Sequence, residues 1–358
     1  MQVAKDKLDQ MEEIDLSLGN VEKKDIVSIV ENYIKENNTQ QHSSNTTHPT
    51  SHLTLPTSHF QPPIKDVNRE KDYQEMGIVI FSEKIRATIK IQDGCNNFCT
   101  YCLIPYARGR VRSRNKNNII EEVTRIAKNG IKEIVITGIH IASYGIDFEE
   151  NYKLIDLLED LNKIEGIKRI RLGSLEPSLI TEEFAIRLSK LEKICNQFHL
   201  SLQSGCNETL KRMNRKYTCE EFEEVTKLLR KYFKDVNLTT DIIVGFPGET
   251  EEEFEKTYKF LKKIKFYKMH VFKYSPREGT TASKMPNQVD GNIKEQRSQK
   301  LIELSNKNQE EYNKIYLSKP VEVLFEEEKD GVWTGYTTNY IKVSKKSKEN
   351  LENKIIIV

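Results

Sequence analysis

The sequence has no apolar run long enough to cross a membrane, and its first residues lack the apolar core of a signal peptide. Its 358 residues carry a formal net charge of only +2, so overall charge neither indicates nor excludes a nucleic-acid partner. Cysteine is scarce, and three of the six cysteines crowd between Cys95 and Cys102. That distribution excludes a disulfide framework and indicates a metal. We therefore expect a cytoplasmic protein without membrane contact.

One segment lacks charge altogether. Residues 37–64 contain no Asp, Glu, Lys or Arg, are rich in Thr, Ser, His and Pro, and predict a disordered low-complexity linker or insert. Residues 1–36 before it have apolar residues at helical spacing, among them Ile26, Val30 and Ile34. We interpret 1–36 as the remnant of an α/β domain.

Beyond Glu83, short β-rich runs alternate with amphipathic helical patterns. The predicted strands are 86–92, 133–138, 169–174, 197–203, 237–246 and 269–275. Six such units predict an α/β core over 81–317, arranged as a partial (β/α)6 barrel, although the pattern also fits a flat doubly wound sheet. Short β-like runs from 318 to 358 predict a small, β-barrel-like C-terminal domain that is incomplete.

The three crowded cysteines form C-x3-C-x2-C directly after the first predicted strand. Strand ends of β/α barrels carry active sites, and three thiolates can hold a [4Fe–4S] cubane with one iron left open. An open iron can chelate the amino and carboxylate groups of S-adenosylmethionine, and Tyr101 would shield that cofactor. Structural zinc is the alternative, but it requires a fourth ligand and no histidine lies near the triplet.

The text DGCNNFCTYCLIPYARGRVRSR resembles the methylthiotransferases of the radical S-adenosylmethionine superfamily. TGIHIASYG, GSLEP, HLSLQSG, RMNRKYT and TTDIIVGFPGETEEEF resemble the later motifs of that family, in the same order. The sequence around the cysteines, GCNNFCTYC and PYARGRVRSR, most resembles the branch that acts on N6-threonylcarbamoyladenosine at tRNA position 37. Other branches modify isopentenyladenosine in tRNA or an aspartate in a ribosomal protein.

The resemblance implies a reaction and its cofactors. S-adenosylmethionine would be cleaved at a [4Fe–4S] cluster held by Cys95, Cys99 and Cys102, and the resulting radical would take hydrogen from C2 of the adenine. A second cluster, held by cysteines of an N-terminal domain, would supply sulfur, and flavodoxin or ferredoxin would supply electrons. No cysteine precedes Cys95 in this chain, so we expect that domain to be truncated and the sulfur-donating half to be missing. A tRNA-binding fragment without turnover is the alternative.

The same motifs suggest residues that contact the cofactor at strand ends. The glycine position beside the cofactor's amino group is implied by the resemblance, and the polar residues would meet its ribose or face the barrel interior. His199 shares a strand face with one of them, and Arg212 or Arg215 could meet the cofactor's carboxylate. The predicted cofactor-binding residues are Gly138, Ser174, Glu176, Gln203 and Gly245.

A basic run follows the cysteines. Arg108, Arg110, Arg112 and Arg114 alternate, which places them on one face if the segment is extended. Because guanidinium groups bind phosphate bidentately, this face predicts contact with the RNA backbone. The C-terminal module resembles an RNA-binding domain, although residues 319–358 have no net charge.

Overall fold

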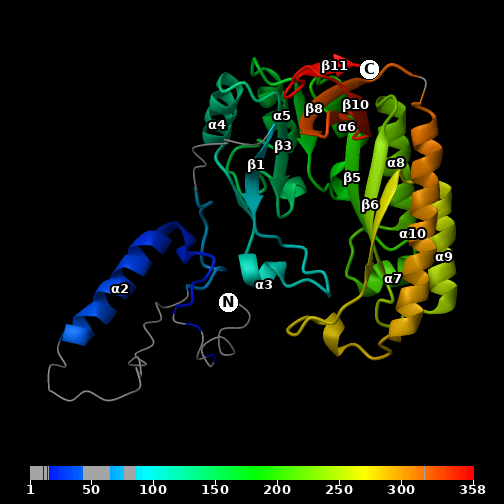
Figure 1. Ribbon diagram of the computed structural model, residues 1–358. Helices are drawn as coiled ribbons and strands as arrows, with labels where there is room; N and C mark the ends of the chain where they lie inside the picture. Colours follow the sequence, from blue (N-terminus) through cyan, green and yellow to red (C-terminus); the bar gives the residue numbers. More distant parts are fainter. Residues whose placement is uncertain (1–10, 12–13, 15, 43–64, 76–84, 318) are drawn as a thin grey trace.

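The computed structural model describes residues 11, 14, 16–42, 65–75, 85–317 and 319–358. Six parallel strands form a curled, open sheet (Figure 1). Two isolated parallel bridges, Ile170 to Ile194 and Leu175 to Leu200, join its two halves. The predicted partial (β/α)6 barrel is therefore confirmed. The strands in spatial order are β1 (Arg86–Asp93), β3 (Glu133–Gly138), β4 (Arg169–Leu172), β5 (Gln197–Gln203), β6 (Asn237–Val244) and β7 (Lys268–Lys273).

Helices cover the outer face of this sheet. Most begin at a residue that caps the first turn: the Thr218 and Thr250 hydroxyls accept from the backbone N–H three residues on, and a glutamate side chain bonds back to each cap. Every second strand residue packs against the helices, so the remaining side chains face the barrel interior. The long helices are α4 (Lys116–Lys128), α5 (Leu154–Asn162), α6 (Glu182–Ser189), α8 (Cys219–Tyr232), α9 (Glu251–Ile264) and α10 (Gly291–Lys314).

The sequence analysis did not predict α10, the longest of these helices. Its apolar residues are few, and only a narrow stripe that includes Leu301 and Leu304 is buried, against β7. Asp290 caps its first turn by accepting from the Asn292 backbone N–H at 2.8 Å. Tertiary contact rather than amphipathic pattern therefore marks this helix.

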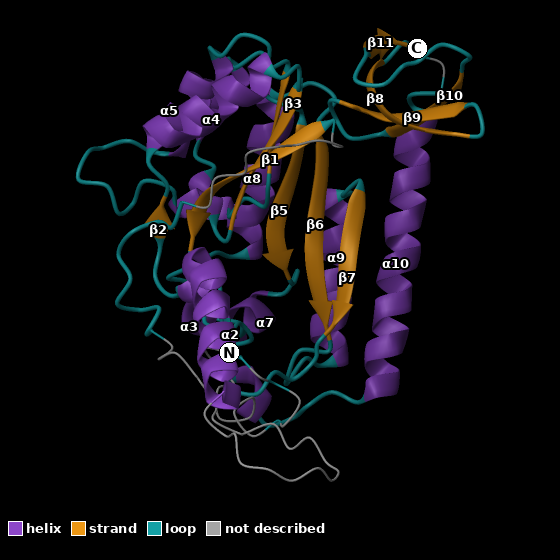
Figure 2. Ribbon diagram, turned by 60° about the vertical axis from the view of Figure 1, so that its left-hand side comes forward, coloured by secondary structure: helices purple, strands orange, loops and turns teal. Residues whose placement is uncertain are grey.

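The C-terminal strands form a four-stranded antiparallel sheet of β8 (Glu322–Lys329), β9 (Val332–Thr337), β10 (Lys342–Lys346) and β11 (Ile355–Ile357). Figure 2 shows it at the opposite end of the barrel strands from α3 (Ile104–Arg108). Buried arginines at the strand starts dock it: Arg169 donates to the Tyr336 carbonyl at 2.8 Å, and Arg171 donates to the Thr338 carbonyl at 3.2 Å. The expected all-β module is present.

The N-terminal segment packs beside the basic run. It forms a short 3-10 helix (Glu22–Asp25) and α2 (Ile26–His42). α2 continues six residues into the segment predicted as a linker, because no proline or glycine occurs there before Pro49 to stop it. Residues 37–42 of the predicted linker belong to α2, and residues 43–64 lie outside the described part of the chain.

The remaining boundary predictions fall partly outside the described residues too, at 1–10, 76–84 and 318. Within the described residues, no helix is long and apolar enough to span a membrane.

Candidate cluster and cofactor site

The cysteine loop leaves β1 through a turn that requires glycine. Gly94 has φ +73°, and a Cβ on it would lie 1.8 Å from the Arg110 carbonyl oxygen. The backbone N–H of Cys95 donates to the Gly109 carbonyl at 3.1 Å, which closes the loop on itself. The chain therefore folds back beside its own start, and the segment between Cys95 and Gly109 holds all three cysteines.

All three sulfurs receive hydrogen bonds from nitrogen. The backbone N–H of Asn97 reaches Cys95 Sγ at 3.5 Å, and that of Ile104 reaches Cys102 Sγ at 3.4 Å. The Arg215 guanidinium reaches Cys99 Sγ at 3.3 Å. Burial raises the pKa of the Cys95 and Cys102 thiols, and these hydrogen bonds act in the opposite direction. Such donors stabilise thiolates, the form that binds iron.

The spacing of the three sulfurs favours a cluster over a single ion. Tetrahedral zinc with Zn–S bonds of about 2.3 Å would hold sulfurs roughly 3.8 Å apart. Among the described residues, only His199, Asp241 and His270 bring three ligand atoms within 4.8 Å of one another. The three cysteine sulfurs therefore lie further apart than that. Cys99 and Cys102 are nevertheless near enough to Cys95 to raise the pKa of its thiol. The donor set therefore fits a cubane, whose iron atoms spread the thiolates further apart.

Segments from the other half of the barrel hold the loop. Thr100 accepts from the Ala282 backbone N–H at 2.8 Å, and its own N–H donates to the Met213 carbonyl at 3.1 Å. Asn214 donates its side-chain amide to the Phe98 carbonyl at 3.0 Å. The loop thus bridges the open barrel, and its shape depends on residues more than a hundred positions away.

Arg215 joins the loop to the barrel wall. Its guanidinium donates to both carboxylate oxygens of Glu176, at 2.8 and 2.9 Å, and both side chains are almost fully buried. Burial would lower the pKa of Arg215, but Tyr217 and Glu176 outweigh it and raise the pKa well above its usual range. His140 Nε2 lies 3.6 Å from Glu176 and 3.2 Å from the Asn97 side-chain amide. Sequence reasoning missed His140, although the TGIHIASYG motif contains it.

A cavity of about 290 Å³ opens beside Cys102. Strand-end residues and the segment after β7 line it, and Gln203 contributes with a backbone φ of +72°. The predicted shielding residue Tyr101 lies in its wall, edge-on to Phe246 with ring centroids 6.2 Å apart. The lining residues are Tyr101, Cys102, Gln203, Asp241, Ile243, Phe272, Lys273, Tyr274, Ser275 and Arg277.

The other predicted cofactor residues lie at strand ends with different surroundings. Gly138 approaches the Gln92 carbonyl so closely that a Cβ would lie 3.0 Å from it. Ser174 is exposed and Glu176 is engaged by Arg215. Gly245 donates its backbone N–H to Glu249 at 2.6 Å and lies beneath the Lys294 side chain, so it is not part of the cavity wall.

The two arginines guessed to meet the cofactor's carboxylate are both engaged by protein groups. Arg212 donates to the Glu253 carboxylate and, at 3.2 Å, to the Pro247 carbonyl. Arg215 holds Glu176 and Cys99, as described above.

The arginine run does not present four side chains to RNA. Arg112 and Arg114 are each 8% exposed. Arg112 donates to the Arg108 carbonyl at 2.9 Å, and Arg114 is held between Glu75 and Glu122. Residues 65–75 cover both side chains, through the Val67 carbonyl at Arg112 and the Glu75 carboxylate at Arg114, so neither is presented to solvent. Arg110 remains exposed, over the Phe98 ring at 4.7 Å, and Arg108 is partly exposed.

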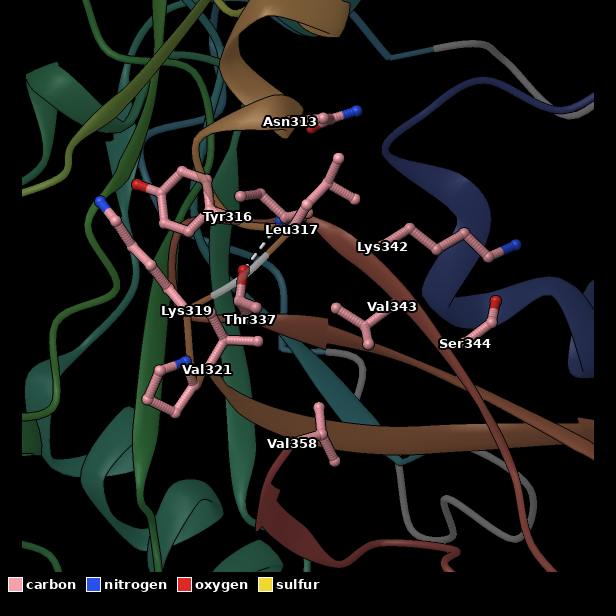
Figure 3. A pocket seen from close by; sticks show the side chains of 12 residues that line it. Asn313, Tyr316, Leu317, Lys319, Val321, Thr337, Lys342, Val343, Ser344 and Val358 are labelled. Carbon is pink, nitrogen blue, oxygen red and sulfur yellow. Dashed lines mark hydrogen bonds between the residues drawn. The ribbon is translucent and has the colours of Figure 1, made fainter.

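A second hollow, of about 740 Å³, lies where α10 meets the C-terminal sheet (Figure 3). Apolar side chains such as Val321, Val343 and Val358 line much of it, with Lys319 and Lys342 at its edges. It lies far from the cysteines, at the other end of the barrel strands. Its lining contains no cysteine or histidine.

Comparison with known proteins matches residues 89–261 to the Radical SAM superfamily. Threonylcarbamoyladenosine tRNA methylthiotransferase MtaB of Bacillus subtilis is 44% identical over 82% of this chain and 66% of its own length. The MtaB of Aquifex aeolicus is 37% identical over 96% of this chain and 77% of its own. A tRNA-2-methylthio-N(6)-dimethylallyladenosine synthase of Alkaliphilus oremlandii is 46% identical over 68% of this chain and 51% of its own.

The chain spans about half to two thirds of the length of several curated relatives that it matches, the Bacillus and Alkaliphilus proteins among them. Among solved structures, coproporphyrinogen III oxidase (HemN) from Escherichia coli aligns with a TM-score of 0.47 and 15% identity, over 63% of this chain and 53% of that one. The range that matches the Radical SAM superfamily, residues 89–261, contains Cys95, Cys99 and Cys102. The sequence identities, together with a cysteine loop above an open six-stranded barrel, show that the chain belongs to the radical S-adenosylmethionine methylthiotransferase family.

Proposed function

We propose that this chain generates the radical in a tRNA methylthiotransferase that acts on C2 of N6-threonylcarbamoyladenosine at tRNA position 37. The relatives of that name match more of this chain than the Alkaliphilus dimethylallyladenosine synthase does. The observation that carries the proposal is the cysteine loop, whose three sulfurs each accept a hydrogen bond and whose last cysteine borders a cavity. Because the substrate is a tRNA, we expect the enzyme to work in the cytoplasm.

Cys95, Cys99 and Cys102 would hold the cluster. With cluster and S-adenosylmethionine bound, the site supplies a 5′-deoxyadenosyl radical that takes a hydrogen atom from the substrate. The backbone N–H groups of Asn97 and Ile104 would offset the negative charge of the thiolates they bond to. An external one-electron donor of the flavodoxin or ferredoxin class would reduce the cluster.

The chain's own residues would position the cofactor and keep water away. Gly138 and Gln203 end barrel strands and Ser174 follows another, and all three would contact the cofactor, with Gln203 in the cavity beside Cys102. Glu176 is bound to Arg215 through two oxygens, so its first role would be to hold the guanidinium against Cys99. The Tyr101 and Phe246 rings would exclude water from one side of the cavity.

Substrate RNA would approach the cysteine end of the barrel, where Arg110 and Arg108 remain accessible. The C-terminal sheet lies at the other end of β1, whose eight residues span about 23 Å at the usual rise. An RNA bound to both would have to extend along the outside of the barrel. We propose that the C-terminal sheet contacts the anticodon stem and that the arginines contact the loop.

The test is an anaerobic iron and sulfide count after cluster reconstitution, together with an assay for 5′-deoxyadenosine under strong reductant. We expect about four irons per chain and 5′-deoxyadenosine formation that rises when a threonylcarbamoyladenosine-bearing anticodon stem-loop is added. The triple variant C95S/C99S/C102S should retain neither iron nor cleavage. The assay targets the radical step, so it needs no sulfur source.

Two rival functions predict different results. Stimulation by isopentenyladenosine RNA, or by a ribosomal protein, in place of the threonylcarbamoyl substrate would assign the chain to another branch. Zinc in the cysteine site, or iron without cleavage of S-adenosylmethionine, would contradict the radical reaction and favour a tRNA-binding role alone.

A further inference from the structure

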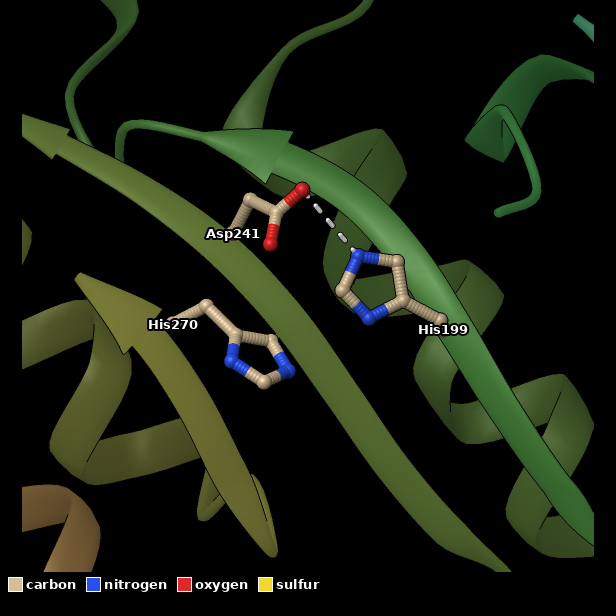
Figure 4. Close-up of side chains that lie close together, drawn as sticks. All are labelled: His199, Asp241 and His270. Carbon is tan, nitrogen blue, oxygen red and sulfur yellow. Dashed lines mark ion pairs between the residues drawn. The ribbon is translucent and has the colours of Figure 1, made fainter. Parts of the chain in front are cut away.

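Three polar side chains meet on the interior face of β5, β6 and β7 (Figure 4). His199 Nε2 lies 3.3 Å from Asp241 Oδ2, and His199 Nδ1 lies 3.0 Å from the Thr239 hydroxyl. Asp241 and His270 are direct neighbours in the register of β6 and β7. One nitrogen or oxygen atom from each of His199, Asp241 and His270 lies within 4.8 Å of the others. This is a group held in place by the sheet, because every member belongs to a regular strand.

The members differ in how far their hydrogen bonds are satisfied. His199 is 14% exposed and uses both ring nitrogens, one toward Thr239 and one toward Asp241. His270 is exposed, and its ring contacts that of His199 with centroids 5.8 Å apart. Within the described part of the chain no hydrogen bond engages a ring nitrogen of His270. His199 therefore fixes Asp241, and His270 is available to a ligand.

One member of this group, Asp241, faces the cavity beside the cysteine loop, and its neighbour His270 lies next to it in the sheet. Asp241 lines the 290 Å³ cavity together with Cys102 and Gln203. Partial desolvation of the His270 ring lowers its pKa, so the neutral ring would offer one N–H donor and one acceptor near pH 7. A carboxylate acceptor thus stands beside an imidazole donor, next to where the radical is expected to form.

The chemistry of the substrate suggests what these groups bind. In adenine, C2 and the exocyclic N6 both lie on the Watson–Crick edge, so a base that turns C2 toward Cys102 carries its N6 substituent into the same cavity. A threonylcarbamoyl substituent has urea N–H donors, a carbonyl, a hydroxyl and a carboxylate. An isopentenyl substituent is pure hydrocarbon. It would desolvate His270 without giving it a partner and would add none to the His199 contact of Asp241, a situation that sites of this kind discriminate against strongly.

We propose that Asp241 and His270 form the subsite for the polar N6 substituent of the target adenosine, with Asp241 accepting from its N–H or hydroxyl groups and His270 donating to its carbonyl or carboxylate. His199 and Thr239 are positioning residues that hold Asp241. The exposed Arg277, in the wall of the same cavity, supplies positive charge for the carboxylate. This inference rests on the proposed function and adds the residues that select its substrate.

The test measures dissociation constants of the cluster-loaded protein for three anticodon stem-loops that differ only at position 37: threonylcarbamoyladenosine, isopentenyladenosine and adenosine. We expect the first to bind at least tenfold more tightly than the other two. H270A should weaken its binding about tenfold and leave the unmodified RNA unchanged, and H270N, which keeps a donor, should restore part of the loss. D241N provides a second, independent variant.

The outcomes separate the two proposals. Equal binding of all three RNAs by the native protein, or equal weakening of all three by H270A, would overturn the subsite. Failure to bind any of the RNAs would instead overturn the proposed function. Stoichiometric zinc bound by the C95S/C99S/C102S variant, and lost with H270A, would also overturn the subsite, since the group would then be a metal site.

Discussion

Arg215 donates two hydrogen bonds of 2.8 and 2.9 Å to Glu176, and the same guanidinium lies 3.3 Å from Cys99 Sγ. One buried ion pair therefore connects the end of β4 to the cysteine loop. Because both partners are almost fully buried, neither can be removed without leaving a charge desolvated. This relationship makes the stability of the barrel and the environment of the cluster depend on the same side chain.

Replacing Arg215 tests that connection. R215A should destabilise the protein by about 3–5 kcal/mol, the usual result of leaving one buried partner unpaired. It should also lower iron retention after reconstitution, because Cys99 loses its hydrogen-bond donor. Urea unfolding and iron analysis would measure both effects. R212A is the matched control. Arg212 lies three residues before Arg215, pairs with Glu253 and is more exposed, so its loss should leave the iron content unchanged.

The Gly94 turn gives a second prediction. G94A should fail to bind the cluster, since its Cβ would lie 1.8 Å from the Arg110 carbonyl oxygen and the loop would have to move. G130A tests the backbone effect alone, because Gly130 also has positive φ but has nothing within 4 Å of the added carbon. We expect G130A to cost about 1–2 kcal/mol and to keep its iron. Thermal unfolding and iron content would distinguish them, and equal iron loss in both would contradict the steric explanation.

A third prediction separates the four arginines of the basic run. R110A should weaken tRNA binding and reduce its dependence on salt by about one phosphate contact, because Arg110 is exposed. R114A should mainly unfold the protein, since Arg114 is held between Glu75 and Glu122. Binding measured at several salt concentrations, alongside thermal unfolding, would test the assignment. An R114A protein that folds normally but loses RNA affinity would contradict the structural role of Arg114 and indicate that it contacts RNA.

The fourth prediction concerns the seam between barrel and C-terminal sheet. Glu133 is 1% exposed and is the shared counter-charge of Arg86, Arg169 and Arg171. E133Q should therefore destabilise the seam by several kcal/mol, because three guanidinium groups lose one carboxylate. Urea unfolding followed by far-UV circular dichroism would measure the loss. E322Q is the control, since Glu322 contacts Arg169 from an exposed position and should matter little.

Local patterns determined much of this protein. Runs of β-branched residues predicted all six barrel strands to within about two residues, because a strand packed by helices needs an apolar side chain at every second position. The cysteine spacing predicted the cluster loop, because its ligands lie within eight residues. Both kinds of information are short-range. The sequence pattern did not predict α10, because so few of its residues are apolar.

Tertiary structure alone decided which polar residues are free to act. The four arginines of the basic run alternate in the sequence. The fold places residues 65–75 over Arg112 and Arg114 but leaves Arg110 exposed. The partnership of Glu176 with Arg215 and the meeting of His199, Asp241 and His270 join strands and loops tens of residues apart. Sequence determines which groups are present, but the availability of a charge depends on the partner that the fold brings to it, because an unpaired buried charge costs too much free energy to persist.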